Sequence, residues 1–257
     1  MALVSEAARR HSVLALVAAA CLGGVATGAS PAPNALSQDE RAQGFELLFD
    51  GLTTRGWRGL REERIAGDRW RVESGVLSAL APPPGEAERN DDIVTLRSFS
   101  SFELRAEFRL SPGANSGIKY FLRPDAAADS GQSSVGHEYQ ILDDAGHPDA
   151  KAGIAGNRTL ASLYDILPAR ADKPQRPIGA WNEAKIVVRG RHVEHWLNGV
   201  KVLEFERGSD DFKAHLATSK HKVWPGYGEE QEGRILLQHH GGGVSYRSIR
   251  IRAQIPE

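Results

Sequence analysis

A single cysteine, Cys21, stands among the 257 residues of the chain. No disulfide can therefore form within it, and a hydrophobic core must hold the fold together. An excess of one charge is also missing, because 32 basic residues oppose 33 acidic ones. There is no basic stripe interleaved with aromatic residues either, so neither nucleic acid nor an anionic membrane surface is an expected partner.

Long apolar segments are missing except near the N-terminus. There, Arg9 and Arg10 precede a run of small apolar residues, 13–25, and Pro31 follows after residues 26–30. This order is typical of a secretory signal, and the run is too short to span a bilayer comfortably. We therefore predict a signal peptide at residues 1–30 and an exported protein, in the periplasm or on the cell envelope of a bacterium.

Two alternatives remain for Cys21. Residues 16–20 (LVAAA) precede it and resemble a bacterial lipoprotein box, in which the cysteine is lipidated and anchors the protein to a membrane. Otherwise, Cys21 is a small apolar residue in a signal that is discarded. Residues 31–43 are polar and contain proline, so they are interpreted as a linker, which leaves residues 44–253 as one domain.

A sustained helical period is absent, and segments of alternating or apolar residues take its place. They are residues 102–110, 117–123, 138–142, 184–188, 192–197, 200–205, 234–239 and 245–252. Asn198-Gly199, between two of them, is a strong hairpin signal, because a type I′ turn needs positive φ at both central residues. The pattern predicts an all-β fold, an antiparallel sandwich or jelly roll. The two long connections, residues 143–180 and 207–233, are where we expect the binding site.

The sequence has no cysteine cluster and no His-x-x-x-His helix, although it contains nine histidines. His192 and His195 face opposite sides of one predicted strand, and the adjacent His239 and His240 also diverge. A dedicated zinc site is therefore not expected. A single histidine that meets acids from other strands is still an open alternative.

Residues 136–144 (GHEYQILDD) predict a strand with two different faces. Tyr139 and Ile141 form a core pair, whereas Glu138 and Gln140 lie side by side on the other face. A second strand end, residues 238–243 (QHHGGG), presents Gln238 and His240 together in the same way. The glycines after it leave room for a ligand to approach the backbone.

The first long connection contains Arg158, Tyr164 and Asp165 within one short stretch, where a guanidinium could bind oxyanions or sugar hydroxyls. Alternatively, Arg158 and Asp165 pair with each other. Trp224, in the second connection, is a candidate for stacking on a sugar. The other four tryptophans are interpreted as core residues: Trp57, Trp70, Trp181 and Trp196.

Eight segments match, in order, a family of known proteins. They are residues 45–57, 70–77, 102–104, 115–118, 138–143, 181–182, 196–199 and 246–251. Together they resemble the bacterial 3-keto-disaccharide hydrolase family. The resemblance implies a concanavalin A-like lectin/glucanase jelly roll whose concave sheet binds carbohydrate, here an oxidised glycoside.

The family includes enzymes that cleave glycosides whose sugar has first been oxidised at C3. A C3 ketone acidifies the C2 proton, so a base can remove it, the C1 substituent can leave, and water can add back. The resemblance and the residue types suggest Glu138 or His240 as the base, Arg158 or a divalent cation for the enolate, and Tyr164 or His195 as the proton donor. The expected substrate contacts are Gln140, Gln238, His195, Asn115, Lys119 and Trp224.

Three points remain open at this stage. A lectin-like domain without catalysis would use the same fold. A conventional glycosidase would pair Glu138 with Asp143 or Asp165, although Glu138 and Asp143 fall on different faces of a regular strand. Finally, relatives often carry aspartate where this chain has His239, so any role of that carboxylate is in doubt here. Alternation also groups His195 with Val193 and Leu197, as a core histidine would be.

Overall fold

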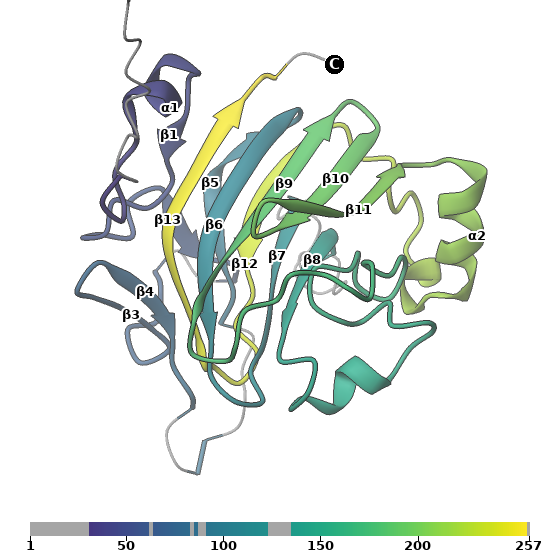
Figure 1. Ribbon diagram of the computed structural model, residues 1–257, viewed down its shortest axis with the longest axis horizontal. Coiled ribbons are helices and arrows are strands. Elements are labelled where there is room, and N and C mark those ends of the chain that lie inside the picture. Colours follow the sequence, from purple (N-terminus) through teal and green to yellow (C-terminus); the bar gives the residue numbers. More distant parts are fainter. Residues whose placement is uncertain (1–30, 62–63, 83–84, 87–90, 123–134, 256–257) are drawn as a thin grey trace, which may run out of the picture. The chain divides into compact units, whose positions relative to one another are not determined.

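The computed structural model describes residues 31–255 except 62–63, 83–84, 87–90 and 123–134. The predicted signal peptide and Cys21 lie outside this range. Two antiparallel sheets pack face to face (Figure 1). The five-stranded sheet has the order β2 (Trp57–Gly59), β5 (Ile93–Phe99), β12 (Gly233–Leu237), β7 (Asn115–Leu122) and β8 (His137–Leu142).

The other sheet has eight strands, which come from both halves of the domain. Its order is β11 (Val200–Glu206), β10 (His192–Leu197), β9 (Trp181–Arg189), β6 (Phe102–Leu110), β13 (Val244–Ala253), β4 (Val76–Ala79) and β3 (Trp70–Glu73), and β1 (Glu46–Leu47) also pairs with β13. The antiparallel β-sandwich of the concanavalin A-like type is thereby confirmed. The predicted hairpin is present too, because Asn198 and Gly199 have φ of 48° and 82° between the paired Leu197 and Val200.

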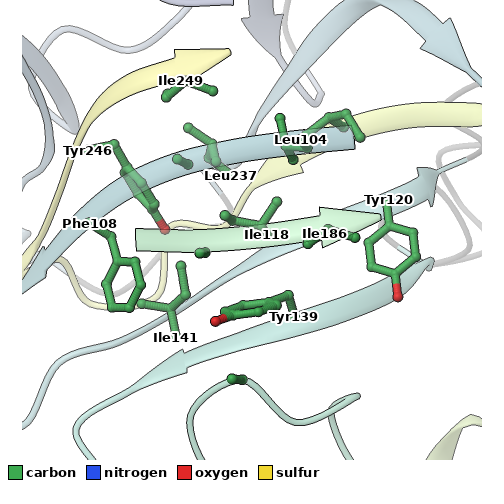
Figure 2. Close-up of a cluster of buried hydrophobic side chains, with 14 of the residues drawn as sticks. Leu104, Phe108, Ile118, Tyr120, Tyr139, Ile141, Ile186, Leu237, Tyr246 and Ile249 are labelled. Atoms are coloured by element: carbon green, nitrogen blue, oxygen red, sulfur yellow. The ribbon is translucent and has the colours of Figure 1, made fainter. Parts of the chain in front are cut away.

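The core lies between the two sheets and follows the period of two in the strands. Tyr139 and Ile141 of β8 are fully buried there, as their alternation predicted (Figure 2). The Tyr139 hydroxyl donates to the Trp196 carbonyl of the opposite sheet at 3.0 Å, so its one polar atom is satisfied. Figure 2 also shows Ile118, Leu104 and Tyr246 in the same layer.

The outer face of the five-stranded sheet is divided into an apolar part and a polar part. Four buried residues form a small hydrophobic cluster there: Leu60, Val94, Leu122 and Leu236. Next to it, the register of β7 and β8 pairs Lys119 with Glu138 and Gly117 with Gln140. The polar part of this face is the candidate site.

Residues 31–43 are not the expected linker. Asn34 is fixed by hydrogen bonds, because its amide nitrogen donates to the Gly75 carbonyl at 2.8 Å and its side-chain oxygen accepts from Ser248 N at 2.8 Å. Helix α1 (Gln38–Ala42) begins with a capping box in which Ser37 and Glu40 exchange hydrogen bonds. The Glu40 carboxylate then accepts from Arg250 Nε of β13 at 2.6 Å, so this segment is part of the folded domain.

Two of the tryptophans assigned to the core are not in it. Trp57 and Trp70 are buried, as expected. Trp181 and Trp196 lie half-buried on the outer face of the eight-stranded sheet, where cations cover their rings. Lys185 Nζ is 3.5 Å from the ring centroid of Trp196, and the Arg247 guanidinium is 4.1 Å from that of Trp181. Cation–π contact thus replaces burial in the core.

The second long connection contains helix α2 (Asp210–Thr218), which Ser209 caps, and the 3₁₀ helix η4 (Lys220–Val223). The first connection contains only the short 3₁₀ helix η3 (Pro148–Lys151) within its otherwise irregular course. Among the helices of the described residues, none is long and apolar enough to cross a bilayer.

Candidate active site

Glu138 is the centre of the polar face. Its residue is 5% exposed, and one carboxylate oxygen, Oε2, lies 3.7 Å from Lys119 Nζ on the neighbouring strand. In the orientation that satisfies both ends of its amide, Gln140 donates to Glu138 Oε1 at 3.1 Å and to the Ser116 carbonyl at 2.8 Å. Glu138, Gln140 and Lys119 are therefore together, as the sequence predicted.

Gly117 explains how the carboxylate fits so close to the sheet. A Cβ at this position would lie 2.4 Å from Glu138 Oε1 and 2.8 Å from its Cγ and Cδ. Only glycine leaves this space free. Because residue 117 has no side chain, the Glu138 carboxylate fills the space that a Cβ would take.

Burial and nearby positive charges shift the pKa of Glu138 in opposite directions. Burial raises the pKa of Glu138 above the ordinary glutamate value of 4.5, while the positive charges of Lys119 and Lys220 offset part of the rise. A carboxylate whose pKa is moved toward neutrality is a stronger base, and the nearby ammonium groups keep it ionisable. The site therefore has the electrostatics of a general base.

Asp92 is a second buried carboxylate at this face, and sequence reasoning missed it. It is 3% exposed and accepts from the His239 backbone N–H at 2.7 Å. Burial also raises its pKa, against the lowering effect of Lys119. Asp92 immediately precedes β5, two strands away from β7 in the sheet, so only the strand order reveals that it lies near Lys119.

Tyr164 reaches the site because the first long connection pairs with the free edge of β8. Tyr164 N donates to the Glu138 carbonyl at 3.0 Å, and Ala161 N and Ser162 O bond to the backbone of Gln140. The edge of the sheet is covered in this way, and the phenol is positioned beside the carboxylate. Burial and its hydrogen bond to Asp149, at 2.8 Å, raise the pKa of Tyr164, so the phenol keeps its proton.

Arg158 does not serve as a free guanidinium for the substrate. Its Nε donates to Asp165 Oδ1 at 2.6 Å and its Nη1 donates to Asp149 Oδ1 at 2.8 Å. Asp165 also accepts from Lys220 N at 2.7 Å, so it joins the first long connection to the second. The alternative in which Arg158 pairs with Asp165 is correct, and the pair clamps the two connections together.

The second connection places Lys220 and His221 at the site, and neither residue was singled out from the sequence. Lys220 Nζ lies 4.2 Å from the centroid of the Tyr164 ring. His221 stacks on Tyr227 at 5.0 Å between ring centroids, and burial lowers its pKa to about 4. The imidazole of His221 is therefore neutral near pH 7. The signal available in the sequence was the run of three basic residues, 220–222.

His240 and Asn115 complete the polar face. An isolated bridge pairs them directly, and the positive form of His240 lowers the pKa values of Glu138 and Asp92, which places it close to both carboxylates. The imidazole is exposed. Gln238 follows β12 and is held through its backbone, because Gln238 N donates to the Gly117 carbonyl at 2.9 Å.

One of the predicted substrate contacts, His195, lies elsewhere, and Trp224 is only partly accessible. His195 is fully buried in the core and cannot donate a proton to a substrate. Its Nδ1 donates to the Ala161 carbonyl at 2.9 Å, so its Nε2 accepts from the Tyr120 hydroxyl at 2.9 Å. Burial lowers the pKa of His195 to about 4. Trp224 is half-buried and packs against the main core cluster.

The carboxylates that a conventional glycosidase would pair with Glu138 have other partners. Asp143 accepts from the backbone N–H groups of Gly113, Ala145 and Gly146, at 2.8, 3.2 and 3.0 Å, and so closes a turn. Asp165 is engaged by Arg158 and by the backbone of Lys220. His239 is buried and bonds to the Leu80 carbonyl, so it is a structural residue.

Among the described residues, one group of three side chains has the spacing of metal ligands, and it lies on the other sheet. Its members are His192, Glu194 and Glu204, whose ligand atoms are within 4.8 Å of one another. Lys201 Nζ already forms ion pairs with Glu194 and Glu204, so an ammonium neutralises both carboxylates. At Glu138, two ammonium groups would repel a divalent cation, and the donor set there is a poor fit for one.

A cavity of about 410 Å³ lies on the outer face of the eight-stranded sheet, around Trp181. Three of its four charged residues are already paired, Arg247 with Glu107 at 2.7 Å and Glu183 with Arg250 at 2.9 Å, and Arg176 donates to the Trp181 carbonyl. Trp181 is also covered by guanidinium groups. The polar face around Glu138 is therefore the better candidate for chemistry.

The chain is similar in sequence to a known protein family and to a bacterial relative. The model of the family described as a 3-keto-alpha-glucoside-1,2-lyase-like domain matches residues 44–252. A 3-keto-disaccharide hydrolase from Bacteroides thetaiotaomicron is 36% identical over 230 residues, which are 82% of this chain and 79% of that protein.

Two solved structures from Parabacteroides distasonis are similar. One, named as a glycosyl hydrolase, has a TM-score of 0.76 at 28% identity and covers 87% of this chain and 100% of its own. The second has a TM-score of 0.62 at 23% identity, covers 82% of this chain and 99% of its own, and shows the fold alone.

Proposed function

The chain belongs to the 3-keto-alpha-glucoside-1,2-lyase-like family, a family of glycoside-cleaving enzymes, and we propose that its substrates are glycosides or disaccharides oxidised at C3. The observation that carries the proposal is the buried carboxylate of Glu138, which pairs with the ammonium group of Lys119 and is influenced by the charge of Lys220. This arrangement suits the removal of a proton next to a ketone, followed by elimination of the C1 substituent and addition of water.

Glu138 acts as the base in this proposal. The C3 ketone acidifies the C2 proton, and the raised pKa of Glu138 brings the strength of the base closer to what the abstraction needs. Glu138 is the second residue of β8, and Gly117 and Lys119 fix its carboxylate from the neighbouring strand. A rigid position of this kind favours proton transfer, because a displacement of about 1 Å is costly.

The other steps use the groups around Glu138. The ammonium groups of Lys119 and Lys220 stabilise the negative charge that develops on the ketone oxygen, a role first suggested for Arg158. Tyr164 keeps its proton and is suited to protonating the leaving group. His240 is exposed at the rim of the polar face and, together with Asn115, Gln140 and Gln238, offers hydrogen bonds to sugar hydroxyls.

The test compares a 3-keto-glucoside carrying a chromogenic aglycone with its unoxidised parent. We expect release of the aglycone from the 3-keto compound alone. Equal release from both would contradict the dependence on the ketone, and release from neither would favour a non-catalytic carbohydrate-binding domain. In D2O, elimination predicts that the product carries deuterium at C2, whereas direct hydrolysis leaves the C2 proton in place.

We also propose that the protein is exported and that residues 1–30 direct the export, since they have the order of a secretory signal. Lipidation of Cys21 is the alternative to complete removal of the segment. Fractionation of bacteria that express the full chain tests both ideas, because a Cys21→Ser variant should leave the membrane fraction only if Cys21 carries a lipid. Retention of the wild-type protein in the cytoplasm would contradict export.

A further inference from the structure

Lys220 differs from two other lysines, Lys119 and Lys173, in having no carboxylate partner among the described residues. Lys119 pairs with Glu138, and Lys173 pairs with Asp144 at 2.8 Å. Lys220 forms no ion pair with any carboxylate of the described part of the chain, and its Nζ lies instead over the ring of Tyr164. The residue is exposed, so a substrate on the polar face can reach its amine.

Other cations surround this amine. Tyr164 carries the Arg158 guanidinium at 5.6 Å from its ring centroid as well as Lys220 at 4.2 Å. Partial burial of the ammonium group lowers the pKa of Lys220 below the usual lysine range, and the charges of Arg158 and Lys119 lower it further, against the raising effect of Glu138 and Asp165. A lysine beside other cations loses its proton more readily and is a suitable nucleophile for a carbonyl group.

The backbone of Lys220 is held in place for such a role. Lys220 N donates to Asp165 Oδ2 at 2.7 Å, and Ser219, which precedes it, is buried and donates to the same carboxylate at 3.3 Å. Asp165 is in turn fixed by Arg158. The two connections thus hold the start of η4 beside Tyr164 and, through it, beside the strand that carries Glu138.

From this geometry we propose that Lys220 forms a covalent imine with the C3 ketone of the substrate. The proposal rests on the function proposed above, but it gives Lys220 a covalent role in place of the charge stabilisation described there. The neutral amine adds to C3 and one of its protons moves to the oxygen, the resulting hydroxyl takes a second proton from solvent and leaves as water, and an iminium results. When Glu138 takes the C2 proton, the electron pair forms C2=C3 and the iminium π electrons move to the nitrogen, giving a neutral enamine.

The remaining steps return the enzyme to its starting state. The nitrogen lone pair restores C3=N, the C2=C3 electrons form C1=C2, and the C1–O bond breaks as the aglycone leaves with a proton from Tyr164. Water adds to C1, its proton returns to Tyr164, and Glu138 protonates C2 after its own proton has exchanged with solvent. Hydrolysis of the iminium then releases the 3-keto sugar and the free amine and returns one proton to solvent. Because the iminium is already positively charged, it accepts the electron pair from C2 more readily than the neutral ketone would.

The first experiment traps the imine in the full chain. Glu138→Gln, which retains Lys220 but lacks the base, is incubated with a 3-keto-glucoside and sodium cyanoborohydride, and peptides are analysed by mass spectrometry. We expect one reduced sugar adduct, on Lys220. The matched control is Lys222→Arg in the same background, since Lys222 is exposed and joins η4 only through its backbone. It should give the same adduct.

The second experiment measures turnover. Lys220→Arg retains the positive charge but not the nucleophile, so kcat should fall at least about 100-fold, as it does on loss of a group that takes part in the chemical step. Lys222→Arg should keep the wild-type rate. Wild-type enzyme in H2¹⁸O should also introduce ¹⁸O into the C3 ketone of the product faster than the uncatalysed exchange, because the ketone oxygen leaves as water.

The outcomes separate this inference from the proposed function. Release of the aglycone from the 3-keto compound without an adduct, without faster ¹⁸O exchange and with a Lys220→Arg rate within threefold of the wild type would overturn the imine and leave the function standing. Absence of release from the wild-type enzyme would overturn both. A Lys220→Arg variant that does not fold leaves the adduct and the ¹⁸O exchange to decide.

Discussion

Gly117→Ala is a test of the site that changes no functional group. The added methyl would lie 2.4 Å from Glu138 Oε1, whereas ordinary contacts begin at 3.4 Å, so the carboxylate would have to move by about 1 Å. Because Cγ and Cδ of Glu138 are also within 2.8 Å, a rotation of the terminal group alone does not remove the overlap. The base is thus displaced while its chemistry is unchanged.

The expected effect falls on the rate more than on stability. A displacement of about 1 Å at a catalytic group costs about 100-fold in rate. The fold should tolerate the change, since overpacking costs about 1–3 kcal/mol and alanine is favoured over glycine in a strand by about 0.5–1 kcal/mol. We therefore expect kcat on the 3-keto substrate to fall about 100-fold while the free energy of unfolding changes by less than about 2 kcal/mol.

Two further glycine substitutions serve as controls. Gly67→Ala meets no atom within 4 Å and should change neither rate nor stability. Gly233→Ala meets the backbone of Phe121 at 2.3 and 2.4 Å, where no flexible group can yield, and should lower stability strongly. Rates are measured by aglycone release and stabilities by urea unfolding. A Gly117→Ala variant with a rate within threefold of the wild type would refute the role of a precisely held Glu138 carboxylate.

Four other predictions follow from the same contacts. The raised pKa of Glu138 means that its ionised form destabilises the fold, so the Glu138→Gln variant should lose activity yet melt no lower than the wild type near pH 7. As the pH falls through the raised pKa, Glu138 becomes protonated and the stability advantage of the variant should vanish. For the same reason, the acid limb of the wild-type kcat/KM profile should lie above pH 4.5. His195→Ala removes hydrogen bonds to Tyr120 and Ala161 and should cost about 3 kcal/mol of stability, measured by denaturant unfolding, with a rate per folded molecule within about threefold of the wild type. Asp165→Asn should lower kcat about 10-fold and expose the two long connections to proteolysis, whereas Asp172→Asn, in the exposed pair with Arg170, should do neither. Chelation with EDTA should leave the rate unchanged, and a loss that Mg²⁺ or Mn²⁺ restores would contradict the poor fit of a divalent cation at Glu138.

The sequence predicted those features that depend on local pattern. Alternation placed Tyr139 in the core and Glu138 and Gln140 on the opposite face, because a strand has a period of two wherever it lies in the sheet. Alternation also grouped His195 with the core residues Val193 and Leu197. The substrate-binding role given to His195 overrode that pattern, and it was wrong.

The features that sequence reasoning missed depend on contacts between distant segments. Asp92 reaches the site only because β5 and β7 both border β12. Lys220 reaches it because Asp165 binds its backbone N–H across 55 positions of the chain. The sequence left the pairing of Arg158 with Asp165 as an alternative, but the second partner, Asp149, becomes close only when the first connection folds back on itself. None of these contacts has a periodic signal in the sequence.

The site combines two parts with different mechanical support. Glu138 and Lys119 are on paired strands, and the first connection bonds to the outer edge of β8, so backbone hydrogen bonds hold Glu138 from both sides. Tyr164 and Lys220 are on connections that depend on the carboxylate of Asp165. Substitutions at the strands should therefore alter the chemical step alone. Substitutions at Asp165 should alter kcat and KM together, because they change how often the donor and the amine are in place.

Asp92 supplies at the polar face the carboxylate that relatives often carry at position 239. In this chain His239 is buried and bonds to the Leu80 carbonyl, and its backbone N–H binds Asp92. Asp92 lies close enough to His240 and Lys119 for their charges to lower its pKa, so a carboxylate is present at the polar face, although it comes from another strand. Asp92→Asn should therefore change the pH dependence of kcat/KM through Lys119 and Glu138, while His239→Gln should change stability and leave that pH dependence as it is.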